Sequence, residues 1–312
     1  MPDKKYFVLF PLLLLLFYNC GNNSAAKQTG TNDTNITIAM FGDQGTTDNS
    51  KKVLQMVKSE GTELLIINGD FDYKNDPKAW QQMNETILGK DFPIVAVAGN
   101  HDIPSWQVYQ AIVELWEKHP GLSCNGIPGV ETTCVYKGIT IVSTTPGLFN
   151  DLNHTQYINN ALFGKKGWKI CSWHKNMAAM QTGGKGDATG WGVYEACRKN
   201  GALITTGHEH AYARTFLLSD IEHQTIADFN QSDMTIEKGK TVVVLSGLGG
   251  ISSRPLIHDG AWWANKQNDN TGATAGAFFC TFRIAGHPDV AECYFKDIYK
   301  GVLDRFTLRL SQ

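Results

Sequence analysis

Five apolar segments of this chain are each followed, within one residue, by aspartate, asparagine or histidine in a short polar motif. These segments lie at residues 37–41, 63–67, 93–98, 169–173 and 202–206. Each has the length of a buried strand, and amphipathic stretches at 49–59 and 77–88 separate the first three. The alternation predicts parallel strands joined by crossover helices. Because parallel strands end at the same edge of a sheet, we expect the motifs to meet at one rim.

The remaining segments predict a second sheet in addition to the parallel one. Strands are expected at 132–136 and 140–144, and helices near 156–163 and 194–200. The C-terminal strands have no helices between them, which predicts a second, more antiparallel sheet from 241–246, 277–283, 291–295 and 304–308. Two glycine-rich stretches, 181–192 and 258–276, are expected to be long loops bordering a site. Trp262 and Trp263 in the second loop either line the substrate or cover the core.

Composition narrows the class of protein. Hydrophobic residues make up 42% of the chain, which is enough for a packed core and excludes a disordered or collagen-like protein. The formal net charge is −2 and no dense basic stripe occurs, so we expect no nucleic-acid partner.

The N-terminus has the pattern of an export signal. Lys4 and Lys5 precede an apolar run at 6–18, which is too short to span a bilayer comfortably and fits a signal peptide at 1–19. Cys20 follows, and the segment resembles a bacterial lipoprotein signal in which this cysteine carries the lipid. The alternative is a secretory signal cleaved a few residues later. We therefore expect a flexible tether at 20–35, one domain at 36–312, and a protein that is lipid-anchored in the periplasm or at the cell surface, or else secreted.

The cysteines agree with export. If Cys20 is lipidated, an even number remains, as is typical of disulfide-bonded proteins in oxidising compartments. Several pairings are open, and an unpaired, buried Cys171 thiol is an equal alternative for that residue. The set we favour is Cys124–Cys134 within a short loop, Cys280–Cys293 across a hairpin, and Cys171–Cys197 by elimination.

The motifs at the strand ends are rich in metal-binding groups. They contribute oxygen and imidazole donors from Asp43, Asp70, Tyr73, Asn100, His174, His208 and His210. This donor set suits iron, zinc or manganese better than calcium. Each motif alone has an ordinary interpretation, such as a turn, a helix cap or a surface histidine pair. Together, each at the end of a strand, they indicate a metal centre.

In order, the motifs resemble those of the calcineurin-like metallophosphoesterase superfamily, and within it the purple acid phosphatases. That pattern is GDxG, GDxxY, GNH(D/E), VxxH and GHxH, and this chain reads GDQG, GDFDY, GNHD, CSWH and GHEH. Cys171 stands where valine is usual, and the family's additional histidines near the substrate have no close match here. The resemblance implies an α/β fold, a two-sheet mixed β-sandwich flanked by helices in αββα order.

The resemblance also implies how the ligands divide between two metal ions. One ion would take Asp43, Tyr73, His210 and the shared Asp70, and the other would take Asp70, Asn100, His174 and His208. Because the Tyr73 phenolate adds a negative charge, we expect Fe(III) at the first position and a divalent zinc, manganese or iron ion at the second. Such a centre should show a visible tyrosinate-to-iron charge-transfer band.

Catalytic roles follow from the same resemblance. Two metal ions would lower the pKa of a shared water and hold phosphate oxygens. His101 is implied to contact the phosphoryl group or protonate the leaving oxygen, and Asp102 to orient it. Asp72 is expected to be a solvated loop residue and Arg214 to be structural. A further imidazole or cation should help to bind phosphate, but the direction of Lys175, the nearest candidate, is open.

These inferences predict an exported hydrolase of small phosphate monoesters, similar to an acid phosphatase. The metal centre alone does not set the ester class, so a phosphodiesterase or nucleotide hydrolase is the alternative enzyme. A surface-binding lipoprotein without activity is the alternative from another class, and the intact ligand set argues against it.

Overall fold

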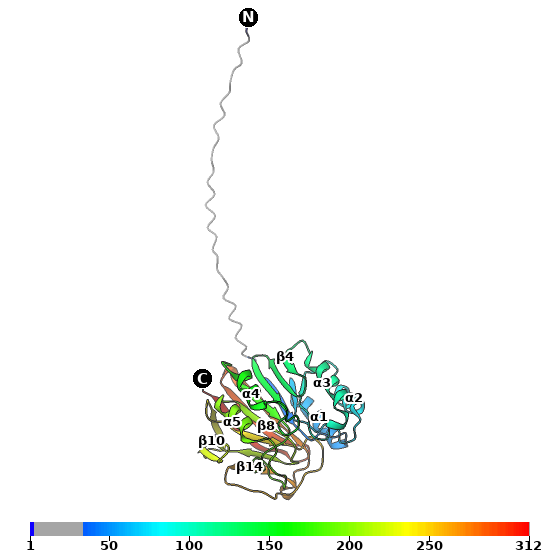
Figure 1. The fold of residues 1–312 in the computed structure, drawn as a ribbon, viewed down its shortest axis with the longest axis vertical. Helices are drawn as coiled ribbons and strands as arrows, with labels where there is room; N and C mark the ends of the chain where they lie inside the picture. The colour runs from blue at the N-terminus through cyan, green and yellow to red at the C-terminus, as the bar shows by residue number, and fades with distance from the viewer. Residues whose placement is uncertain (3–33, 312) are drawn as a thin grey trace. The chain divides into compact units, whose positions relative to one another are not determined.

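Strands in the described part of the chain form two large sheets that share one apolar core (Figure 1). The computed structural model describes residues 1–2 and 34–311. Nearly all of the predicted signal peptide and tether, including Cys20, lies outside the described residues. None of the helices in the described part is long and apolar enough to cross a membrane.

The first sheet has seven strands in the order β12-β17-β16-β15-β1-β2-β3. Their bounds are β1 Ile36–Phe41, β2 Leu64–Ile67, β3 Ile94–Ala96, β12 Asp233–Ile236, β15 Gly276–Phe282, β16 Val290–Asp297 and β17 Gly301–Leu310. As expected, β1, β2 and β3 pair in parallel.

The second sheet has eight strands in the order β14-β9-β13-β8-β7-β6-β5-β4. They are β4 Leu122–Ile127, β5 Glu131–Tyr136, β6 Ile139–Thr144, β7 Lys169–Trp173, β8 Leu203–Thr206, β9 Tyr212–Thr215, β13 Val243–Ser246 and β14 Trp263–Gln267. A separate two-stranded ribbon joins β10 Leu217–Asp220 to β11 Thr225–Asp228.

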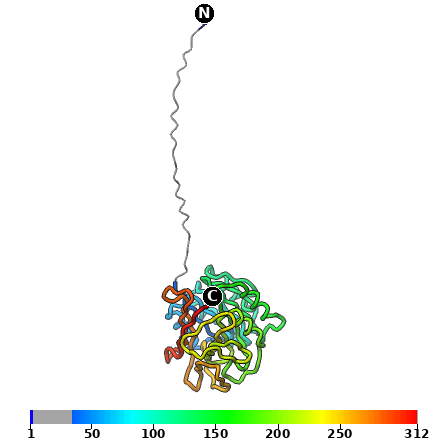
Figure 2. The backbone as a smooth tube through the Cα atoms, turned by 90° about the vertical axis from the view of Figure 1, so that its left-hand side faces the viewer, coloured from blue at the N-terminus to red at the C-terminus, as the bar shows by residue number. Residues whose placement is uncertain are grey.

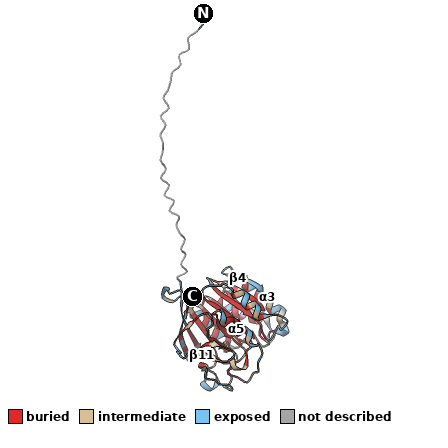
Figure 3. Cartoon of the chain, turned by 60° about the vertical axis from the view of Figure 1, so that its left-hand side comes forward, coloured by how far each residue is buried: buried red, intermediate tan, exposed pale blue. Residues whose placement is uncertain are grey.

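Helices cover the outer face of each sheet, which confirms the predicted αββα order. Those on the first sheet are α1 Asp48–Ser59, α2 Pro77–Leu88 and α3 Trp106–Glu117, and those on the second are α4 His154–Leu162 and α5 Trp191–Lys199. The central strands are therefore buried on both sides, and Figure 3 shows much of the sheets in the colour of buried residues. In β1, Ile38 and Met40 face the other sheet while Ala39 and Phe41 face the helices, which explains the continuous apolar run in the sequence.

The C-terminal strands correct one expectation. They were predicted to build a second sheet, but β15, β16 and β17 extend the first one, because β15 pairs antiparallel with β1. The blue and the orange-to-red segments consequently lie side by side in Figure 2. Strand β13 joins the other sheet and pairs in parallel with β8. Such pairings join residues far apart in sequence, which local patterns do not reveal.

The second glycine-rich stretch is also more ordered than expected. It was predicted to be a loop, but strand β14 lies within it and pairs with β9. Trp263 is buried in a small cluster with Ala213 and Leu245, so it covers the core. The first stretch ends two residues early, because α5 begins at Trp191.

Three disulfides match the favoured pairing: Cys124–Cys134, Cys171–Cys197 and Cys280–Cys293. The first and third join directly opposed residues of antiparallel neighbours, and the second ties α5 to β7. Three disulfides indicate an extracellular or periplasmic protein.

Candidate metal centre

The predicted ligands sit on short loops just beyond the strand ends, and their backbones are unusual. Asp43, Asp70, Tyr73 and His208 have φ angles of 59°, 55°, 62° and 77°. Residues other than glycine rarely adopt this left-handed region, and such conformations concentrate at functional sites. Four predicted ligands therefore share a strained backbone that the surrounding loops must maintain.

Gly99 shows why glycine begins the third motif. A Cβ atom at this position would lie only 2.2 Å from the backbone nitrogen and the side-chain Oδ1 of Asp70. Any other residue would therefore force apart the loops that carry the second and third motifs.

One set of donors comes from the first, second and fifth motifs. The Tyr73 hydroxyl lies 2.7 Å from Asp43 Oδ1 and 3.1 Å from His210 Nε2. His210 Nε2 lies 3.4 Å from the same Asp43 oxygen. Three donor atoms that are remote in sequence thus converge on one point.

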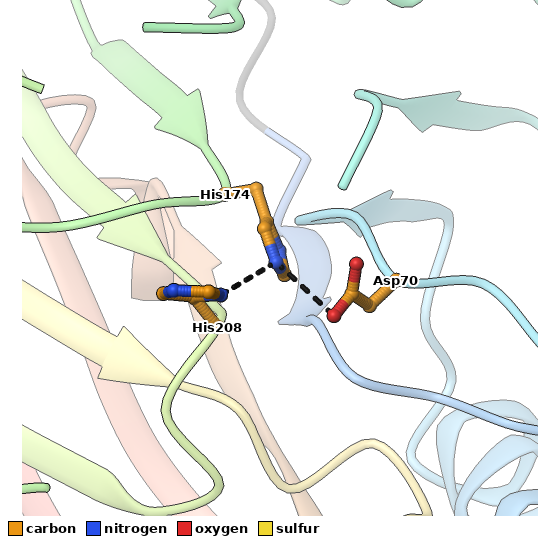
Figure 4. Close-up of side chains that lie close together, drawn as sticks. All are labelled: Asp70, His174 and His208. Atoms are coloured by element: carbon orange, nitrogen blue, oxygen red, sulfur yellow. Dashed lines mark hydrogen bonds and ion pairs between the residues drawn. The ribbon is translucent and has the colours of Figure 1, made fainter. Parts of the chain in front are cut away.

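A second set converges beside it, around His174 (Figure 4). His174 Nε2 lies 3.2 Å from Asp70 Oδ2, 3.1 Å from His208 Nδ1 and 3.2 Å from Asn100 Oδ1. Asp70 also acts electrostatically on Tyr73, so it stands between the two sets. The structure therefore brings all seven predicted ligands together, in the two groups that the resemblance implied.

Opposite charges and burial shape the titration of this site. Burial disfavours the charged His174 ring, but the Asp70 and Asp43 carboxylates outweigh it and raise the pKa of His174 to about 9. Burial, followed by the neighbouring His174 ring, lowers the pKa of His208. Burial and the carboxylates of Asp43 and Asp70 hold the pKa of Tyr73 far above its usual value. The phenolate of Tyr73 therefore requires a cation in the site.

Backbone carbonyls orient two of the rings. His174 Nδ1 lies 2.7 Å from the carbonyl oxygen of Asn68, and His210 Nδ1 lies 3.1 Å from that of Ser252. A proton on each Nδ1 would leave the Nε2 lone pair facing the other donors. The Asn68 side chain is itself held by Ser172 and Thr205. These supporting residues are not visible as a sequence motif.

His101 lies at the solvent side of the site. Its backbone N–H donates to Asp70 Oδ1 over 2.9 Å, while its exposed ring lies against Tyr73 with centroids 4.5 Å apart. This placement leaves the imidazole accessible to a bound molecule.

Asp102 makes different contacts from those expected. Its buried carboxylate accepts backbone hydrogen bonds from Gly99 at 2.7 Å, Phe71 at 2.8 Å and Asp70 at 3.0 Å. These bonds tie the second motif to the third beneath the metal ligands. We therefore assign Asp102 to positioning the loops, since its described hydrogen bonds run to backbone and not to the His101 ring.

Asp72 is not the solvated residue that we expected. It is buried, its carboxylate accepts three backbone N–H bonds from the loop after Tyr73, and the Tyr109 hydroxyl donates to it over 2.6 Å. Arg214 is structural, as expected, because its buried guanidinium forms a bidentate ion pair with Asp304.

Sequence reasoning missed Lys185 as a candidate phosphate contact. The two glycine-rich stretches join into one lip, because Ile257 and His258 both donate to the carbonyl of Thr182. From this lip the Lys185 ammonium reaches the carbonyl oxygen of His208. Burial lowers the pKa of Lys185, and the carboxylate of Asp43 opposes this shift. Lys175, the earlier candidate, instead donates to Gly147.

The donor set fits a dinuclear metal centre. Metal–ligand bonds of about 2.0–2.2 Å place neighbouring ligand atoms roughly 3–3.5 Å apart. The nitrogen–oxygen and nitrogen–nitrogen separations in the two sets, 3.1–3.4 Å, fall in that range. Asp43 and Asp70 are almost fully buried, and buried carboxylates need compensating positive charge.

Comparison with known proteins agrees with this geometry. The calcineurin-like phosphoesterase family matches residues 30–212, which is more than half of the chain. The chain belongs to this family. Members typically bind a dinuclear metal centre and hydrolyse phosphoesters. A search of curated proteins found no significant match.

Solved structures share the fold at low sequence identity. A purple acid phosphatase from yellow lupin (Lupinus luteus) seeds has a TM-score of 0.66 at 15% identity, covering 89% of this chain and 54% of its own. This chain thus spans about half the length of the lupin enzyme. GAP50, described as the anchor in the inner membrane complex of Plasmodium, has a TM-score of 0.61 at 11% identity, with 89% and 90% covered. PhoD has a TM-score of 0.56 at 11% identity, with 88% and 70% covered.

Proposed function

We propose that this protein hydrolyses phosphate monoesters outside the cytoplasm at a dinuclear centre similar to that of purple acid phosphatases. The observation that carries the proposal is the convergence of seven donor side chains in two sets, with the Tyr73 hydroxyl in one of them and Asp70 between them. The first set, Asp43, Tyr73 and His210, suits Fe(III), and the second suits zinc, manganese or iron(II). A lipid on Cys20 would anchor the enzyme to the membrane.

When bound, the two ions would supply a water of lowered pKa and would hold phosphate oxygens. The chain's own groups orient the substrate around them. His101 stands exposed beside Tyr73, where its imidazole can donate a proton to the leaving alcohol. Asp102 accepts hydrogen bonds from the backbone N–H groups of Asp70 and Gly99 and so holds the two loops together.

Lys185 supplies the second cationic contact that phosphate binding requires. Among the described residues it has no carboxylate partner, and its assigned acceptor is the His208 carbonyl. An ammonium carries three N–H donors, so two remain for phosphate oxygens. The glycines around Lys185 allow the lip to lie close to the fifth motif, since a Cβ at Gly183 would overlap the Glu209 carboxylate.

The test is turnover of matched chromogenic phosphate monoester and diester substrates by the purified, metal-loaded protein. We expect a monoester preference that Asp70→Ala abolishes and His101→Ala strongly reduces. His223→Ala, at an exposed histidine on the β10–β11 ribbon, is the matched control and should not change the rate. A diester preference would move the function to the phosphodiesterase alternative, and a protein that binds no metals would refute the proposal.

A further inference from the structure

A second candidate site lies at the opposite end of the sheets from the metal centre. A cavity of about 540 Å³ opens beside the first residue of β7, Lys169, whereas the other end of that strand leads to His174. Lysine side chains line much of it, at positions Lys165, Lys166, Lys169 and Lys238. The acidic residue among the lining groups, Glu237, is paired with Lys240 outside it. The cavity therefore has an excess of positive charge.

Lys169 is the least expected member of this group. Its side chain is only 8% exposed, yet among the described residues it has neither a hydrogen-bond acceptor nor a carboxylate partner. Burial, together with the neighbouring Lys238, lowers its pKa. Buried lysines in folded proteins are almost always paired. A largely buried lysine whose ammonium has no partner and opens onto the cavity, beside a second lysine, points to an anionic ligand in the space they share.

The ends of two helices meet this cavity but do not supply the missing partner. Helices α4 and α5 end at Leu162 and Lys199, and the negative ends of their dipoles favour a nearby cation. However, backbone and side-chain N–H groups already bond the last carbonyls of α5, those of Ala196, Cys197 and Arg198. Among the described residues, the helix ends therefore provide no hydrogen-bond acceptor for the Lys169 ammonium.

Apolar groups form the other part of the wall. Leu162, Phe163 and Leu310 line the cavity, and the Phe163 side chain is 85% exposed at its rim. A large exposed aromatic beside lysines is typical of surfaces that meet phospholipid headgroups.

We propose that this cavity binds the phosphate group of an amphiphilic phosphate ligand, with the lysines on the phosphate oxygens and the apolar wall against the attached carbon chain. The ligand would be either a phospholipid headgroup at a membrane surface or a soluble phosphate ester. The described chain enters the first sheet at this end, because Ile36, Phe282, Ala291 and Leu308 lie in one row across it. The predicted tether therefore joins the domain at the same end as the cavity.

The experiment uses the chain from residue 20 onward with Cys20→Ser, which keeps every described residue of both sheets and removes the predicted lipid. Sedimentation measures binding to vesicles of phosphatidylglycerol and of phosphatidylcholine, and calorimetry measures binding of inorganic phosphate. The test variants are Lys169→Met and the exposed pair Lys165→Gln/Lys166→Gln. The control, Lys78→Gln/Lys90→Gln, makes the same charge change at exposed lysines outside the cavity.

A membrane ligand predicts preference for phosphatidylglycerol and a loss of about thirtyfold in the Lys165/Lys166 variant but not in the control. A soluble ligand predicts no vesicle preference but a phosphate-binding event that Lys169→Met removes. If both test variants bind vesicles and phosphate like the parent, the proposal is overturned. Because the exposed pair does not support the fold, it keeps the test valid even if Lys169→Met fails to fold. The rate of monoester hydrolysis should be the same in all of these variants. The outcome of this test therefore does not depend on the proposed function.

Discussion

Replacing Asp102 by asparagine separates its two conceivable roles. In the structure its carboxylate accepts N–H bonds from Asp70, Phe71 and Gly99 at 2.7–3.0 Å, with Oδ2 serving two donors and Oδ1 the third. An asparagine side chain of the same shape keeps one acceptor oxygen and turns an NH2 group toward at least one buried backbone N–H. The change therefore removes one hydrogen bond to the carboxyl group and leaves a buried backbone N–H unsatisfied.

The size of the effect follows from these bonds. Hydrogen bonds to charged groups contribute about 1.5–3 kcal/mol each, and an orphaned buried donor costs a comparable amount. We expect Asp102→Asn to lower the free energy of unfolding by about 3 kcal/mol, which corresponds to a fall of roughly 5 °C in Tm for a domain of this size. The control is Asp76→Asn at the N-cap of α2, where asparagine caps equally well and Tm should hardly move.

Calorimetry of the metal-free protein measures this loss, and the pH profile of kcat/KM tests the alternative. If Asp102 only positions the loops, the variant loses stability and metal affinity while the apparent pKa values of the profile stay in place. A variant as stable as the parent, with a shifted profile, would refute our assignment and restore the role of orienting His101.

Further predictions concern Tyr73, Lys185 and Glu117. Tyr73→Phe removes the only phenol in the ligand sets, so the iron-loaded protein should lose its visible charge-transfer band; a variant that keeps the colour contradicts the Fe(III) assignment. Lys185→Met should raise the inhibition constant for inorganic phosphate about tenfold or more, because a charged contact is lost. The control Lys175→Met should leave this constant unchanged, because the Lys175 ammonium donates to Gly147. Equal inhibition constants for the parent and Lys185→Met would show that Lys185 does not contact phosphate. Burial raises the pKa of Glu117 to about 8. At pH values between the ordinary glutamate pKa and about 8, Glu117 therefore keeps a proton in the folded protein that it has lost in the unfolded chain. The free energy of unfolding falls as the pH rises through this range. Urea titrations of metal-free Glu117→Gln at pH values near 5 and 8 should show a smaller difference than the parent, and an unchanged difference would count against this explanation.

Local sequence patterns predicted the features that depend on residue type and on neighbours close in the chain. The first three motif loops directly follow strands whose apolar runs are buried on both faces, so their convergence at one rim needed only parallel β1, β2 and β3. The fourth and fifth motifs follow the parallel strands β7 and β8 of the other sheet, so their approach to the first three depends on how the two sheets pack. Two disulfides join opposed strands of hairpins, which short sequence separation favours.

Non-local pairing limited what could be predicted. Strand β15 pairs with β1 across most of the chain, and β14 was hidden in a glycine-rich stretch that becomes a strand only because β9 offers an open edge. Asp72 was misjudged because an isolated aspartate in a loop is usually solvated, whereas here Tyr109 from α3 closes over it.

The sequence by itself determined the donor atoms and the strand ends that carry them, because ligand chemistry and strand burial are properties of residue type and local order. The tertiary structure decided which groups bond to those donors and their loops. Asp102 bonds to the backbone of two loops, the Asn68 carbonyl to His174, and Lys185 to the carbonyl of His208. It also brought four lysines around one cavity at the far end of the sheets. These groupings depend on how distant segments approach one another, and that is set by the packing of the two sheets as a whole.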